Sequence, residues 1–151
     1  MAAHAKLAAL ALVALALSAP ATAQRTGGEL TLARLDPQAL EPGRCGLFLW
    51  SRGEPPEFVF VAYDEPALAR VKLGGREREM PRTAFSGGVL TGHFEQQIYA
   101  AEGVRLEVQV RADELRSVRD GTIIGDGVIR IIEDDGWESV VPVGGMIACQ
   151  R

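Results

Sequence analysis

The segment Val104-Arg105-Leu106-Glu107-Val108-Gln109-Val110-Arg111 alternates aliphatic and polar side chains along its whole length. Successive side chains of a β-strand point to opposite faces of the sheet, so this alternation predicts a strand with one buried and one solvated face. Phe58–Tyr63 is apolar at every position, which predicts a central strand or one that is covered on its second side. These two segments indicate an all-β protein.

Other segments with β character are bounded by Gly, Pro and Asp, at a spacing typical of short strands and turns. We expect strands at Cys45–Trp50, Arg70–Leu73, Arg76–Met80, His93–Tyr99, Val128–Glu133, Ser139–Val143 and Met146–Cys149. Residues 30–35 predict an edge strand, residues 36–43 a loop or a single helical turn, and the charged residues 113–120 a short helix. About eight or nine strands in one chain predict a small antiparallel β-barrel or sandwich.

Two turns follow from residue type. Gly74-Gly75 can supply the positive φ angles of a two-residue hairpin turn, which places Lys72 opposite Glu77 and Arg70 opposite Glu79. The charges of this stretch then neutralise one another across the strands, which argues against a phosphate-binding patch. Asp134-Asp135-Gly136 predicts a second tight turn.

The amino terminus predicts export. Residues 1–23 have a basic start, an apolar stretch from Leu7 to Leu17 and small residues before Gln24, the layout of a cleaved signal peptide. That stretch is too short for a membrane span, which needs roughly 20 residues, and no other apolar run approaches this length. We therefore expect a periplasmic or secreted product without a transmembrane segment, made of an irregular segment at 24–44 and a single β domain at 45–151.

Charge and size limit the partners. The chain has 151 residues and a net charge of −4, which becomes −5 when Lys6 is removed with the signal. An acidic protein has no electrostatic support for sequence-independent binding to nucleic acid or anionic lipid, whereas it suits a basic protein partner. No heptad or internal repeat in the sequence defines an oligomeric state.

Cys45 and Cys149 are the two cysteines of the chain. In an oxidising compartment two thiols that come close are usually joined, so we predict one structural disulfide between the ends of the β domain. A redox pair or a metal site is the alternative. It lacks both a Cys-x-x-Cys spacing and a histidine cluster.

Catalytic chemistry has few candidates. His93 is the only histidine after the signal, and we expect it on the surface or partly buried. Ser86 lacks a Gly-x-Ser-x-Gly elbow, and the acidic pairs that begin at Asp64 and Asp134 are typical of turns. We therefore predict a non-enzymatic protein without metal or cofactor; an enzyme that uses His93 with Ser86 or Asp64 is the alternative. The two tryptophans, Trp50 and Trp137, are either binding anchors or packing residues of the core or rim.

A family resemblance gives the most concrete functional hypothesis. The chain resembles the periplasmic C-type lysozyme inhibitors of the MliC/PliC kind, which are small β-barrels. The similarity covers most of residues 45–106 and is carried by Ala84-Phe85-Ser86-Gly87-Gly88-Val89-Leu90, Gly92-His93-Phe94 and Ala101-Glu102-Gly103-Val104-Arg105-Leu106.

The resemblance implies a binding site at Ser86, Gly87, Glu102 and Gly103, because a Ser and a Lys at two of these positions enter the lysozyme cleft in that family. Here Glu102 stands where the family has Lys, and Leu90 where it has Tyr. A carboxylate at that position would repel the two active-site carboxylates of a lysozyme. The resulting hypotheses are an exported binding domain similar to a lysozyme inhibitor or, as the alternative, a structural or accessory protein of the cell envelope.

Overall fold

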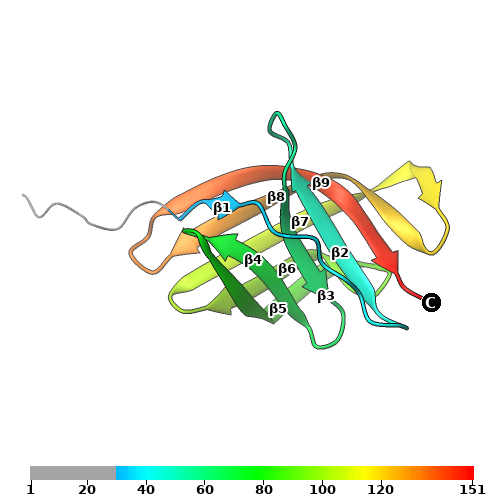
Figure 1. Cartoon of the computed structure of the whole chain (residues 1–151), viewed down its shortest axis with the longest axis horizontal. Helices are drawn as coiled ribbons and strands as arrows, with labels where there is room; N and C mark the ends of the chain where they lie inside the picture. Colours follow the sequence, from blue (N-terminus) through cyan, green and yellow to red (C-terminus); the bar gives the residue numbers. More distant parts are fainter. Residues whose placement is uncertain (1–29) are drawn as a thin grey trace, which may run out of the picture.

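The computed structural model describes residues 30–151, so the predicted signal peptide lies outside the described residues. The described chain contains β-strands and no helix (Figure 1). The strands are β1 (Leu32–Ala33), β2 (Cys45–Ser51), β3 (Phe58–Tyr63), β4 (Leu68–Leu73), β5 (Arg76–Leu90), β6 (His93–Ala101), β7 (Val104–Val118), β8 (Gly121–Glu133) and β9 (Glu138–Cys149).

Strands β2 to β9 form a closed antiparallel barrel in which each strand pairs with its neighbours in sequence. The barrel closes where β9 pairs with β2, from Cys45↔Cys149 to Ser51↔Val143. Strand β1 is an additional short strand that pairs with the end of β4. The structure therefore selects the barrel from the two predicted architectures. The predicted disulfide is also confirmed, since Cys45 and Cys149 are bonded.

The barrel interior is filled by side chains. Phe60 and Tyr99 meet edge to face with ring centroids 5.6 Å apart, a favourable aromatic geometry, and both are fully buried. Further apolar residues, most of them from β2, β4, β5, β7, β8 and β9, complete the core, as the alternating pattern of β7 predicts. They include Leu47, Leu49, Val71, Leu73, Met80, Leu106, Val108, Ile129, Ile131, Val143 and Ile147.

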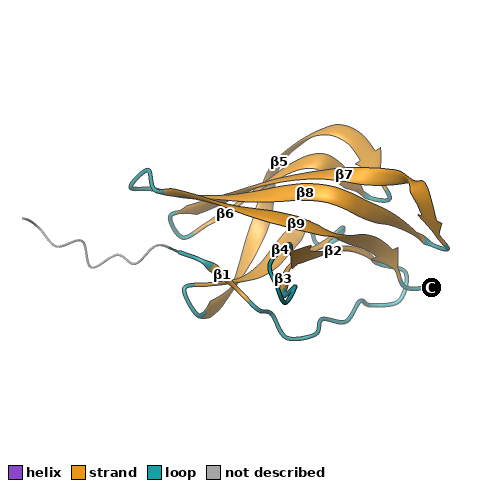
Figure 2. Ribbon diagram, turned by 90° about the horizontal axis from the view of Figure 1, so that it is seen from above, coloured by secondary structure: helices purple, strands orange, loops and turns teal. Residues whose placement is uncertain are grey.

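The segment between β1 and β2 covers the outer side of the barrel at β2 and β3 (Figure 2). Leu35 in this segment is 1% exposed, and its N–H donates to the carbonyl of Phe58 at 2.8 Å. Leu40 lies over Gly46, where an added Cβ would come within 2.8 Å of its side chain. This cover explains why β3 is apolar on both faces, as the sequence predicts. The segment is a loop, without the helical turn considered for residues 36–43.

Both predicted turns are confirmed. Gly74 and Gly75 have φ angles of 55° and 79°, and the hairpin register places Lys72 opposite Glu77 and Arg70 opposite Glu79. Arg70 and Glu79 form an ion pair at 2.5 Å. Residues 134–136 form the turn between β8 and β9.

Residues 113–120 correct the sequence prediction, because β7 extends to Val118 where a short helix was expected. The segment is poor in β-forming residues, but pairing of Ser117 with Thr122 and of Val118 with Gly121 holds it in a hairpin with β8. Tertiary pairing thus overrides local preference.

Glycine-containing segments also predict strand ends at positions where the structure continues the strand. Gly144-Gly145 lies inside β9, so the two strands predicted at 139–143 and 146–149 are one. Strand β5 likewise continues through Gly87-Gly88 to Leu90, and Asp126-Gly127, which reads as a turn signal, lies at an irregularity within β8. Glycine in these strands accompanies bulges and close backbone approach rather than strand ends.

Candidate binding surface

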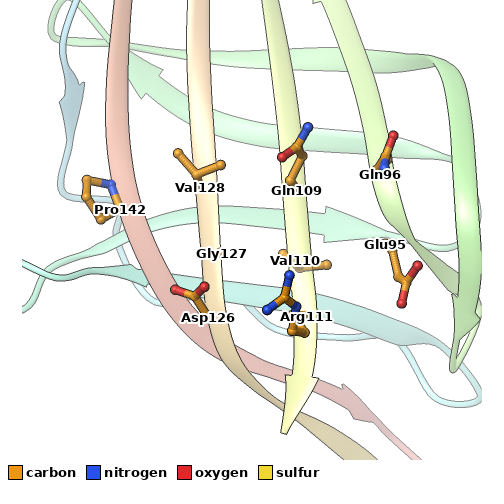
Figure 3. A pocket seen from close by; sticks show the side chains of 9 residues that line it. All are labelled: Glu95, Gln96, Gln109, Val110, Arg111, Asp126, Gly127, Val128 and Pro142. Atoms are coloured by element: carbon orange, nitrogen blue, oxygen red, sulfur yellow. The ribbon is translucent and has the colours of Figure 1, made fainter.

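Five strands carry a row of small and polar side chains on the outside of the barrel. The strand registers place Ser86 beside Gln96, Gln96 beside Gln109, Gln109 beside Val128, and Val128 beside Pro142. Figure 3 shows the last four of these residues side by side across β6 to β9. We call this row and the two hollows along it the β5–β9 surface.

The first hollow, of about 480 Å³, lies where β6 and β7 separate. The two strands pair from Ala101↔Val104 to Gln96↔Gln109, and their pairing stops there. Beyond this point Glu95 of β6 and Arg111 of β7 face the hollow, and Asp126 lies opposite Arg111 on β8 (Figure 3). The lining is therefore mixed, with polar and apolar groups and charges of both signs.

The second hollow, of about 200 Å³, adjoins the first and is bordered by Ser86 and Phe85 of β5. Ser86 donates a hydrogen bond to Oε1 of Gln96 at 3.0 Å, and the N–H of Gly88 donates to a carboxylate oxygen of Glu95 at 2.8 Å. These contacts hold the irregular part of β5 against β6. The side chain of Phe85 in this part of β5 is 57% exposed.

Strand β5 also has a free edge. Strand β4 pairs with β5 from Leu73↔Arg76 to Leu68↔Pro81, and the N–H of Arg82 donates to the carbonyl of Ala67. In the described part of the chain, no strand pairs with that side of β5 beyond this point. The free part includes the exposed side chains of Phe85 and Val89, and unpaired edges of this kind can add a strand from a partner.

An arginine-centred cluster supports this part of β5 from within. Phe85 and Phe94 stack with centroids 4.0 Å apart, and the guanidinium of Arg82 lies 5.3 and 5.2 Å from their ring centroids. Arg82 also donates to Oε1 of the buried Gln97 at 3.0 Å, and the hydroxyl of Tyr99 donates to the same oxygen at 2.9 Å. The exposed Phe85 and the half-buried Phe94 are thus anchored to the barrel core.

The structure does not bring the predicted site residues together. Ser86 and Gly87 lie in the second half of β5, whereas Glu102 and Gly103 form the turn between β6 and β7. From Gln96, the neighbour of Ser86, to Glu102 the chain advances six strand residues, or roughly 20 Å. At this turn the carboxylate of Glu102 lies 3.5 Å from the guanidinium of Arg78.

Gln96 and Gln109 are the surface residues that the sequence did not single out. Gln109 occupies a polar position of an alternating strand, and Gln96 lies in the polar run Glu95-Gln96-Gln97, so both read as ordinary solvated side chains. Only the register across three strands places them next to Ser86.

The structure also places the other residues that the sequence singles out as candidates for catalysis or binding. Asp64 accepts hydrogen bonds from the N–H groups of Cys45 and Glu65, which is typical of a turn residue. Trp50 and Trp137 are both exposed at the rim of the fold rather than packed in the core. His93 was expected on the surface or partly buried, and this is wrong, because its side chain is fully buried.

Neither ring nitrogen of the buried His93 imidazole makes a hydrogen bond of ordinary geometry, although the backbone of Cys45 and the side chain of Gln97 lie close enough to affect its charge. Burial lowers the pKa of His93 below its ordinary value of 6.5, and Arg82 acts in the same direction. The backbone of Cys45, the carboxylate of Asp64 and the side chain of Gln97 oppose this shift without reversing it. His93 is therefore neutral in the folded protein at neutral pH.

The neutral state of the buried His93 imidazole predicts that the stability of the protein depends on pH. Below pH ~6.5 the unfolded chain takes up a proton on His93 before the folded chain does, so the free energy of unfolding falls as the pH decreases. A His93→Leu variant removes this group, and its stability is expected to depend less on pH between about 7 and 5, a window chosen above the ordinary carboxylate pKa values. Urea unfolding at several pH values measures both slopes. Equal slopes in the two proteins would contradict the buried neutral state.

Searches with protein-family models, curated proteins and solved structures found no match to this chain. No helix among residues 30–151 is long and apolar enough to cross a membrane.

Proposed function

We propose that this protein is an exported, non-enzymatic binding domain that captures a protein partner through the β5–β9 surface. The observation that carries the proposal is the free, exposed half of β5 beside two open hollows, on a barrel whose interior is filled. A free strand edge offers main-chain hydrogen bonds, and Phe85 and Val89 offer apolar contact beside it. The burial of His93 supports a non-enzymatic role, because its imidazole does not reach the surface.

A C-type lysozyme is the most concrete partner. The net charge of the mature chain favours a strongly basic protein through long-range attraction. The objection raised by Glu102 is weakened, since Arg78 lies beside its carboxylate and offsets its charge. The separation of Ser86 from Glu102 means that a partner contacting both must span roughly 20 Å of the barrel wall.

The test is a titration of mature protein, residues 24–151, against a C-type lysozyme, with binding and cell-wall hydrolysis followed together. We expect binding that strengthens at low salt and an equimolar loss of hydrolysis. Gln109→Arg, at the centre of the β5–β9 surface, is expected to weaken binding at least about tenfold, which corresponds to about 1.4 kcal/mol.

Gln150→Arg is the matched control. Gln150 is exposed at the end of β9, and the substitution makes the same change of residue and charge. Long-range attraction falls equally in both variants, so only the difference between them reports on the surface. Binding that is equal in the two variants would place the contact elsewhere.

A structural or accessory protein of the cell envelope is the second candidate function. It is favoured by surface ion pairs with ordinary structural surroundings, such as Arg70–Glu79 and Arg44–Glu65. Absence of lysozyme binding at low salt would support this candidate over the inhibitor.

A further inference from the structure

A third hollow borders the β5–β9 surface at β8 and β9 but shares no lining residue with its two hollows. It has a volume of about 710 Å³ and lies between the loop after β2 and the β7–β8 hairpin. Its apolar lining residues are Trp50, Pro56, Ile123 and Ile124, and its four glycines, which include Gly144 and Gly145, contribute main chain without side chains. We call it the Trp50 hollow.

Trp50 is supported on one side and open on another. Its ring lies against Phe58 with centroids 5.1 Å apart, and Phe58 in turn stacks on Phe48 at 6.1 Å. The residue opposite Trp50 on β9 is Gly144, so no side chain from that position covers the indole. Trp50 is 37% exposed as a result. An aromatic ring that is fixed from behind and open in front is suited to stacking with a ligand.

The glycines also make room for Arg52. An added Cβ on Gly144 would come within 2.8 Å of the Arg52 guanidinium. Arg52 spans the hollow to donate hydrogen bonds to the carbonyl of Gly125 and, at 3.5 Å, to that of Val143. These bonds hold the Arg52 side chain in place, and Arg52 is one of the residues that line the hollow.

The charged residues around the hollow balance. Arg52 and Arg116 oppose Glu54 and Asp113, and Asp113 lies 3.3 Å from Arg116. A rim of zero net charge provides no attraction for an anion or a cation. It does provide hydrogen-bond donors and acceptors of both kinds, together with the hydroxyl of Ser51.

We propose that the Trp50 hollow binds a neutral oligosaccharide, with one sugar ring stacked on Trp50. The C–H face of a pyranose is apolar and flat enough to pack on an indole, while its hydroxyl groups both donate and accept hydrogen bonds. Carboxylate and guanidinium groups at the edge of an aromatic platform satisfy these hydroxyls without requiring a charged ligand. The site is independent of the protein-binding function proposed above.

The chain offers a direct reporter for this site. It contains two tryptophans, so Trp137→Phe leaves Trp50 as the single fluorescent indole. The probes are three neutral tetrasaccharides, made of N-acetylglucosamine, of β-1,4-linked glucose and of α-1,4-linked glucose. We expect at least one to change the Trp50 emission saturably at millimolar concentration, with little dependence on salt. Tetragalacturonate, which is anionic, is expected to bind at least about tenfold more weakly.

Two variants of the full mature chain locate the binding, measured by calorimetry so that no tryptophan signal is needed. Trp50→Ala removes the stacking platform, and Gly144→Leu fills the hollow while leaving Trp50 in place; each is expected to weaken binding at least about tenfold. Trp137→Phe is the matched control and should bind as the wild type does. No response of Trp50 to any neutral probe, tighter binding of tetragalacturonate, or full binding by a folded Gly144→Leu variant would each overturn the proposal.

Discussion

Replacing Cys45 and Cys149 together with alanine is expected to lower the free energy of unfolding by about 2–5 kcal/mol. The bond joins residues 104 positions apart, and it ties the first strand of the barrel to the last. In the chain-entropy model a cross-link over a loop of about 100 residues stabilises the folded state by up to ~4.7 kcal/mol, because it restricts the unfolded chain. Denaturant unfolding of the variant and the oxidised wild type measures the difference.

The reduced wild type is the control for this experiment. If the bond acts through the unfolded chain, the reduced protein should unfold at nearly the same denaturant concentration as the double alanine variant. A variant whose stability lies within about 0.5 kcal/mol of the oxidised wild type, the range of an ordinary surface substitution, would show that the cross-link is not a major source of stability.

Gly145→Ala is expected to destabilise the barrel by about 3 kcal/mol or more, at the upper end for an overpacked site. A Cβ on Gly145 would lie 2.0 Å from the carbonyl oxygen of Phe48 and 3.0 Å from Cα of Leu49. Both are backbone atoms of the paired strand β2, so no side-chain rotation relieves the contact. The β2–β9 pairing that closes the barrel must move instead.

Gly53→Ala is the matched control for Gly145→Ala. At Gly53 the nearest atoms to an added Cβ are 3.8 Å away. This substitution should therefore change stability by no more than about 0.5 kcal/mol. Thermal or urea unfolding of both variants gives the comparison, and equal effects at the two positions would refute the close approach of β9 to β2.

Much of the fold follows from the sequence, because a two-residue period is a direct consequence of strand geometry. The alternation at 104–111 and the hairpin at Gly74-Gly75 both predict their elements and, for the hairpin, the register. The wrong predictions lie where contacts between distant parts of the chain determine the local structure. Residues 113–118 belong to β7 despite their composition, because Ser117 and Val118 pair with β8. Gly144-Gly145 predicts a break in the strand, but in the structure Gly145 lets β9 approach β2 closely.

Less of the β5–β9 surface could be predicted from the sequence. Ser86 follows from a motif along one segment, whereas Gln96 and Gln109 join it only through registers that no local pattern encodes. Glu102 is grouped with Ser86 by the family resemblance, but the length of β6 separates them. The burial of His93 likewise depends on how the start of β6 is placed in the barrel rather than on its immediate neighbours.

The closure of the barrel by β2 and β9 has a consequence for folding kinetics. Hairpins between successive strands form from local contacts, but the last pairing brings together residues 104 positions apart and must overcome the loop-closure entropy of nearly the whole domain. We expect the sheet to stay open until that step, with β2 and β9 as its unpaired edges. The partly folded chain is therefore most exposed to pairing with another copy just before it completes the native state.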